Sequence, residues 1–188
     1  DAVADEPRVM PHLHLSLQSG DDMILKRMKR RHVRADAIRF CREARRLRPD
    51  IVFGADLIAG FPTETEEMFA SSGRLVDECG LTYLHVFPFS SRPGTPAARM
   101  PQVAGTVVKA RAAQLRERGR ATLAGYLAGQ VGHSTEILME SDGLGRTPGF
   151  AEIELDGGGA AGEFVQARVI ASDGKRLQGQ LLAPKCAQ

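Results

Sequence analysis

The chain has 188 residues, of which 43% are hydrophobic and 26% charged, and its formal net charge is +2. This composition is ordinary for a globular protein, and no apolar run approaches the roughly 20 residues of a membrane span. A complete (β/α)8 barrel needs about 250 residues, so any barrel here must be partial. We expect a cytoplasmic protein without a membrane partner, and Asp1 in place of an initiating Met indicates a piece of a longer one.

Residues 12–18 form the first predicted strand, with Leu on one face and His, Ser and Gln on the other. Both faces of a parallel sheet are normally buried, so a polar inner row predicts a wet or ligand-filled interior. Helices are expected over residues 23–31 and 35–48. Strand and helix patterns alternate in this way through the first hundred residues, the order typical of a parallel sheet covered by helices.

A nearly continuous apolar strand is predicted at residues 51–59. Thr63 and Glu66 have the spacing of a capping box, which would start a helix ending before Gly80. A third strand is expected at residues 82–89, followed by a turn-rich loop. We interpret the carboxylates that follow the second strand as first-turn residues at a helix N-terminus: Glu64, Glu66 and Glu67.

A long helix is predicted from Val107 to about Leu127, and the character of the chain changes after it. Short strands separated by Gly and Asp predict a small β-barrel of the oligonucleotide-binding type. Gly157, Gly158 and Gly159 form a loop in this interpretation, because no strand-to-helix junction accompanies them. The expected strands are 134–140, 150–155, 163–170 and 176–182.

Charge is distributed unevenly along the chain. Residues 21–48 hold eleven Lys and Arg against four Asp and Glu, residues 105–128 hold five against one, and residues 129–188 hold five against eight. Basic helices of this kind either contact a polyanion or are simply solvated faces, and the two interpretations stay open.

Three cysteines, Cys41, Cys79 and Cys186, lack the spacing of a zinc site or an iron–sulfur cluster. Cys41 and Cys79 lie inside amphipathic helical patterns, so we expect both to be small buried hydrophobes.

His12 and His14 share one face of the first strand, an arrangement that barrel metallohydrolases use to bind metal. Barrel active sites lie at the carboxyl ends of strands, however, and these histidines lie at the start of their strand. We therefore expect polar wall residues here and no metal ligand, with a metal-dependent hydrolase as a minor alternative.

The carboxyl ends of the predicted strands supply the best candidate site. Their side chains offer amide, hydroxyl and aromatic groups, and Gly60 allows a close backbone approach, a combination that suits a nucleoside. An ordinary turn at Gly60, Phe61 and Pro62 is the equal alternative. The candidates are Gln18, Ser19, Gly60, Phe61, Pro62 and Phe87–Ser90.

Four motifs in order resemble the later part of a radical S-adenosylmethionine methylthiotransferase. They are Pro-His-Leu-His-Leu-Ser-Leu-Gln-Ser-Gly from Pro11, Ile-Leu-Lys-Arg-Met-Lys-Arg-Arg from Ile24, Asp-Leu-Ile-Ala-Gly-Phe-Pro-Thr-Glu from Asp56, and Arg-Pro-Gly-Thr-Pro-Ala from Arg92. The resemblance covers about residues 10–185.

The resemblance implies an α/β fold: the C-terminal half of a partial (β/α)6 barrel in residues 1–104, a linker helix in 105–128 and a TRAM β-barrel in 129–188. Two [4Fe–4S] clusters belong to the family, but this chain contains neither of the cysteine sets that bind them, so no catalytic residue is assigned. S-adenosylmethionine would be bound by Gln18, Ser19, Arg30, Gly60, Phe61, Pro62 and Phe87, with Arg92 on the substrate side.

The family branch that the segment from His85 to Ser90 most resembles acts on N6-threonylcarbamoyladenosine at position 37 of tRNA. Other branches act on isopentenyladenosine in tRNA or on a ribosomal protein. The family chemistry implies reductive cleavage of S-adenosylmethionine and transfer of a methylthio group to C2 of the adenine. Alone, the chain is expected to be catalytically inactive. A noncatalytic RNA-binding fragment is the alternative of another class, and an exposed barrel edge is compatible with a homo-oligomer.

Overall fold

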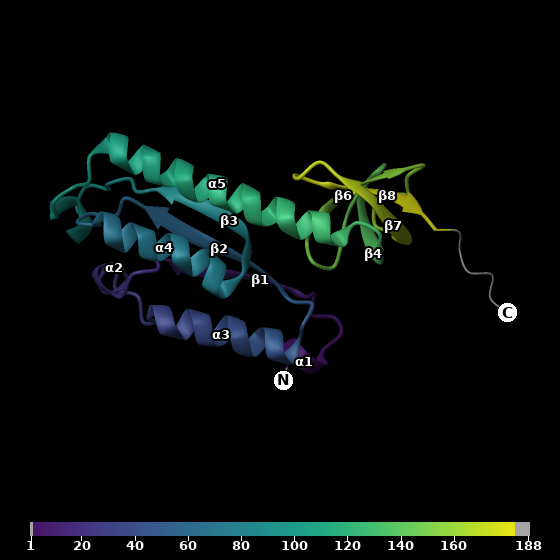
Figure 1. Cartoon of the computed structure of the whole chain (residues 1–188), viewed down its shortest axis with the longest axis horizontal. Helices are drawn as coiled ribbons and strands as arrows, with labels where there is room; N and C mark the ends of the chain where they lie inside the picture. The colour runs from purple at the N-terminus through teal and green to yellow at the C-terminus, as the bar shows by residue number, and fades with distance from the viewer. Residues whose placement is uncertain (1, 183–188) are drawn as a thin grey trace. The chain divides into compact units, whose positions relative to one another are not determined.

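The computed structural model describes residues 2–182 and divides into two compact units. One unit consists of residues 13–119. The other combines the first twelve residues with the part of the chain from Arg120 onward. Figure 1 traces the order of helices and strands along both units, which are described separately below.

A three-stranded sheet with strand order β1-β2-β3 forms the centre of the first unit, and β2 and β3 pair in parallel. Helices connect the strands in sequence order, as predicted, so the unit is part of an α/β barrel wall (Figure 1). The elements are β1 (His12–Gln18), α2 (Asp22–Arg27), α3 (Arg34–Leu47), β2 (Val52–Ala59), α4 (Glu66–Cys79), β3 (Leu81–Pro88), the 3-10 helix η1 (Pro96–Arg99) and the first half of α5 (Gly105–Gln130).

The two faces of the sheet differ in burial. On β2, Phe53, Ala55 and Leu57 are fully buried, whereas Asp56 and Ile58, which point to the other face, are partly exposed. Burying apolar side chains stabilises the fold by about 1.5–3 kcal/mol each, so this face anchors the sheet to its helices. The opposite, polar face is the one that the alternation in β1 predicted.

The end of α2 and the start of α4 differ from the predictions, and α5 extends beyond its predicted range at both ends. Asp21 caps α2 by accepting from the backbone N–H groups of Met23 and Ile24, but the helix ends at Arg27 and the chain turns through Lys29, whose φ is 59°. Helix α4 begins two residues later than the capping-box pattern indicated, because Thr65 accepts from the N–H of Met68. Gly80 ends α4 in the left-handed conformation, as expected.

Cys41 on α3 and Cys79 on α4 are both fully buried and unbridged, which confirms their prediction as small core residues. A hydrogen bond with Cys79, together with burial, raises the pKa of the Cys41 thiol well above its usual range. The same hydrogen bond lowers the pKa of the Cys79 thiol, so the raised value applies to Cys41 alone. Cys186 lies outside the described residues.

The second unit contains a closed five-stranded barrel with order β4-β5-β6-β8-β7. Its strands are antiparallel apart from the parallel pair β6–β8. Closure leaves no free sheet edge, which is how small Greek-key barrels of the oligonucleotide-binding type are built. The elements are α1 (Ala2–Asp5), the second half of α5, β4 (Ser134–Ser141), β5 (Leu144–Arg146), β6 (Glu152–Asp156), β7 (Phe164–Ser172) and β8 (Leu177–Leu181).

The barrel has a core of its own. Alternate residues of its strands point inward, and Leu127 from α5 joins them. Within the described residues, 2–182, no helix is long and apolar enough to cross a membrane. The buried core residues are Leu127, Ile137, Met139, Ala151, Ile153, Leu155, Ala167, Val169 and Leu177.

Candidate functional site at the carboxyl ends of the strands

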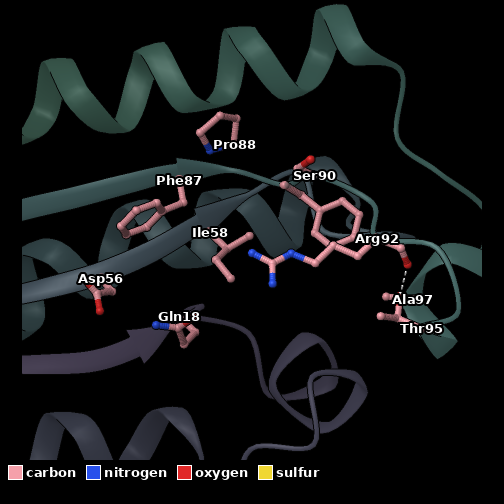
Figure 2. A pocket seen from close by; sticks show the side chains of 10 residues that line it. Gln18, Asp56, Ile58, Phe87, Pro88, Ser90, Arg92, Thr95 and Ala97 are labelled. Atoms are coloured by element: carbon pink, nitrogen blue, oxygen red, sulfur yellow. Dashed lines mark hydrogen bonds between the residues drawn. The ribbon is translucent and has the colours of Figure 1, made fainter.

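A groove of about 510 Å³ opens at the carboxyl ends of the three parallel strands. Figure 2 shows its side chains converging from β1, β2, β3 and the loop after β3. Its walls are mainly apolar, with a few polar groups, which is the usual character of a small-molecule site. The lining residues are Gln18, Asp56, Ile58, Phe87, Pro88, Phe89, Ser90, Arg92, Thr95 and Ala97.

Three strand tips place Gln18, Ile58 and Phe87 together. Ile58 and Phe87 are register partners on β2 and β3, so their side chains share one face of the sheet. Phe87 is 51% exposed, and its ring is available for stacking on a planar ligand. Gln18 has a φ of 67°, a conformation that few residues other than glycine adopt. Strain of this kind occurs where a binding site fixes the backbone.

The loop after β3 contributes Arg92. The Thr95 hydroxyl donates a hydrogen bond of 2.8 Å to the Arg92 carbonyl, which closes a tight turn ahead of η1. Figure 2 shows the Arg92 side chain extending from this loop toward the strand tips. An exposed guanidinium beside an apolar groove can bind an anionic or carbonyl group of a ligand.

The structure brings Gln18, Phe87–Ser90 and Arg92 together in this groove. The remaining predicted site residues, Ser19, Arg30, Gly60, Phe61 and Pro62, are not among its lining residues. The buried Ser19 hydroxyl instead contacts Ser72 of α4 and accepts from the N–H of Asp21. Arg30 is exposed and follows the end of α2.

Gly60, Phe61 and Pro62 form a buried turn behind the groove. The Gly60 N–H donates a 2.9 Å hydrogen bond to the Glu64 carboxylate, and the Phe61 ring packs edge-on against Phe89 at 5.2 Å between centroids. Since Phe89 lines the groove, these residues support its wall from behind.

Glu66 and Glu67 lie in the first turn of α4, as predicted, but Glu64 corrects this expectation because it precedes the helix. Its side chain is fully buried and lies 2.9 Å from the Arg111 guanidinium of α5. Burial raises the pKa of the Glu64 carboxyl above its usual value, although the Gly60 N–H and Arg111 oppose this effect. The pair fixes the turn after β2 to α5.

Sequence reasoning missed Asp56, Ile58, Thr95 and Ala97 as lining residues. Asp56 carried a signal, since it is a single carboxylate within an otherwise apolar strand. In the structure it contacts His14 and His85 from the two neighbouring strands. No comparable signal distinguished Ile58, because apolar residues are expected throughout a buried strand.

A parallel sheet with a ligand-sized groove at its carboxyl ends, in a chain that also holds a small closed β-barrel, defines part of an α/β-barrel enzyme with an appended β-module. Comparison with known proteins specifies the class further. Residues 1–76 match the model of the radical SAM superfamily.

Curated relatives align along nearly the whole chain. The threonylcarbamoyladenosine tRNA methylthiotransferase MtaB of Rickettsia prowazekii is 49% identical over 170 residues, covering 90% of this chain and 40% of the relative. The tRNA-2-methylthio-N(6)-dimethylallyladenosine synthase of Erythrobacter litoralis is 38% identical over 182 residues, covering 93% of this chain and 41% of the relative. A synthase of the same name from Cereibacter sphaeroides is 35% identical over 189 residues, covering 97% of this chain and 43% of the relative.

The chain belongs to the radical SAM methylthiotransferase family. It spans about two fifths of the length of these relatives. The groove fits the adenosyl part of S-adenosylmethionine, since it joins an exposed ring at Phe87 to the polar side chain of Gln18. Among residues 2–182 the cysteines, Cys41 and Cys79, are buried and do not fit an iron–sulfur cluster.

Proposed function

We propose that this chain forms part of a tRNA methylthiotransferase, and that its groove holds S-adenosylmethionine during transfer of a methylthio group to an N6-modified adenosine. The convergence of Gln18, Ile58 and Phe87 on one groove is the observation that carries the proposal. The names of the similar proteins support the reaction class.

Three groove residues have specific roles in this proposal. The Phe87 ring stacks on the adenine, and the Gln18 amide hydrogen-bonds the ribose or the amino acid part. Arg92, at the outer side, meets the tRNA nucleoside. When bound, S-adenosylmethionine would supply the radical chemistry, while these residues orient the reactants and limit the access of water.

The threonylcarbamoyl form of adenosine is the proposed substrate. The relative named for that nucleoside is 49% identical, compared with 38% for the first of those named for the dimethylallyl form. Arg92 favours the same choice, since a threonylcarbamoyl group carries a carboxylate that a guanidinium can bind and a dimethylallyl group carries none.

A chimera tests this proposal. This chain replaces the matching 40% of the Rickettsia prowazekii relative, in a bacterial strain that lacks its own methylthiotransferases. Mass spectrometry of tRNA nucleosides should detect the methylthio form of threonylcarbamoyladenosine. Phe87→Ala should lower its amount about 5- to 150-fold if stacking contributes about 1–3 kcal/mol.

Phe40→Ala is the matched control, since this exposed ring on α3 does not line the groove. Methylthiolation of only the dimethylallyl nucleoside would overturn the proposed substrate. An expressed chimera without either product, beside an active Rickettsia prowazekii protein, would overturn the proposed function.

The proposed tRNA contacts lie on the basic helices rather than on the barrel. Residues 129–188 carry five Lys and Arg against eight Asp and Glu, although single-strand binders usually present a basic groove. Arg30, Arg31 and Arg42 are exposed cations within or beside α2 and α3.

Changing all three arginines to Glu should weaken tRNA binding and flatten its dependence on salt, because fewer counterions are released. Filter binding at two salt concentrations measures both effects. Arg168→Glu, an exposed change on β7, should alter neither. Equal affinity of the triple variant and the unchanged chain would refute these contacts.

The remaining features of the proposed protein follow the family pattern. Residues 1–104 are the proposed end of the radical SAM barrel, 105–128 the linker and 129–188 a TRAM domain. Two [4Fe–4S] clusters would be bound by residues of the whole enzyme outside residues 2–182. Assembly into a homo-oligomer through the sheet edge and a cytoplasmic location complete the proposal.

A further inference from the structure

We infer that His14, Asp56 and His85 form a binding site for a divalent transition metal such as Zn²⁺ or Co²⁺. The three residues lie on β1, β2 and β3, on the same polar face of the sheet. Their ligand atoms all lie within 4.8 Å of one another. Two imidazoles and one carboxylate form a donor set that suits these metals.

The distances fit a shared ion. His14 Nε2 lies 2.9 Å and His85 Nδ1 lies 3.5 Å from the same oxygen, Asp56 Oδ1. In tetrahedral zinc sites, bonds of about 2.0–2.2 Å place neighbouring ligand atoms about 3.3 Å apart. Small side-chain movements would therefore let the three atoms surround one ion.

Two neighbouring residues support this arrangement. The Ser16 hydroxyl donates to the other carboxylate oxygen, Asp56 Oδ2, at 3.4 Å, which orients the carboxylate while leaving Oδ1 to the imidazoles. Gly54 makes room for His14, because a Cβ at that position would lie 2.5 Å from the imidazole Nδ1. A side chain at residue 54 would push the imidazole away from Asp56.

The cluster is also accessible. The side chains of His14, Asp56 and His85 are 32%, 25% and 63% exposed, and Asp56 lines the groove at the strand tips. Three protein ligands leave a coordination position for water or a ligand group, as catalytic zinc sites do. This site does not depend on the proposed methylthiotransferase function.

Titration of the metal-free, untagged 188-residue chain with Co²⁺, followed by visible absorption, tests the inference. One Co²⁺ should bind per chain with the spectrum of a nitrogen- and oxygen-ligated ion, and Zn²⁺ should displace it. His85→Ala should reduce the affinity for Co²⁺ by at least about 100-fold. Removing a residue that only supports a metal ligand usually reduces metal affinity about 10- to 100-fold. Because the His85 side chain is 63% exposed, we expect this variant to keep its fold.

Gly54→Ala changes no ligand, yet it should weaken Co²⁺ binding about 10- to 100-fold by displacing His14. His133→Ala, an exposed histidine outside the cluster, should leave binding unchanged. Circular dichroism of each variant confirms that the fold is intact. Failure of the unchanged chain to bind one Co²⁺, or equal binding by folded His85→Ala, would overturn the inference.

Discussion

At the scale of single residues, Gly60 shows how a backbone requirement and a packing requirement coincide. Its φ is 75°, and a Cβ there would lie 2.6 Å from Cγ2 of Val108 on α5. The sequence left two interpretations of Gly60 open, a close backbone approach to a ligand and an ordinary turn. In the structure, the group that approaches is a side chain of the protein itself.

Gly60→Ala should therefore destabilise the chain more than Gly94→Ala. Gly94 has a similar φ of 84° with nothing within 4 Å, so its substitution adds only the backbone strain of about 1–2 kcal/mol. Overpacking against Val108 should add about 1–3 kcal/mol at Gly60. Urea unfolding measures both variants. Equal destabilisation would show that the Val108 contact relaxes without cost.

At the scale of elements, the buried Glu64–Arg111 ion pair connects the turn after β2 with α5. Removing one partner of a buried pair leaves an uncompensated charge, so Arg111→Met should destabilise the fold by about 3–5 kcal/mol at neutral pH. Lys109→Met, an exposed change on the same helix, should stay within about 0.5 kcal/mol. Chemical denaturation of both variants tests this difference.

The pH dependence of Arg111→Met has a defined sign. Burial already raises the pKa of Glu64, and loss of the guanidinium should raise this pKa further. A carboxyl whose folded pKa is raised stabilises the fold below its unfolded pKa, and this contribution is lost as the pH rises through the folded pKa. The destabilisation by Arg111→Met should therefore shrink as the pH falls toward about 4. If the destabilisation by Arg111→Met stayed constant from neutral pH to about pH 4, the raised pKa assigned to Glu64 would be contradicted.

Most elements could be predicted from the sequence because their hydrophobic periods are clear. The start of α4 was displaced because both Thr63 and Thr65 can cap a helix, and only the backbone decides between them: Thr63 has a φ of 68°. Strand β5 was missed because it has three residues, Leu144–Arg146, too few to show a period. Its pairing with β4 and β6 defines it.

At the scale of the whole molecule, the two units have separate cores. Ile153 belongs to the barrel core and Leu57 to the sheet of the first unit, and both are fully buried. The barrel core contains no residue of the first unit, so local unfolding of one unit need not unfold the other.

Ile153→Ala should destabilise the barrel by about 2–5 kcal/mol. Hydrogen exchange followed by mass spectrometry should then show faster exchange in β4–β8 and unchanged exchange in β2 and β3. Leu57→Ala should produce the reverse pattern and serves as the matched comparison. Faster exchange of both units in either variant would show that they unfold together.

The sequence by itself determined the family, the order of elements and six groove residues, Gln18, Phe87–Ser90 and Arg92. These follow from local period and motif order, which neighbouring residues encode. Only the tertiary structure decided that Glu64 pairs with Arg111, 47 residues away, and that His14, Asp56 and His85 meet across three strands. Strand register and helix packing set such contacts, and no local pattern specifies either of them.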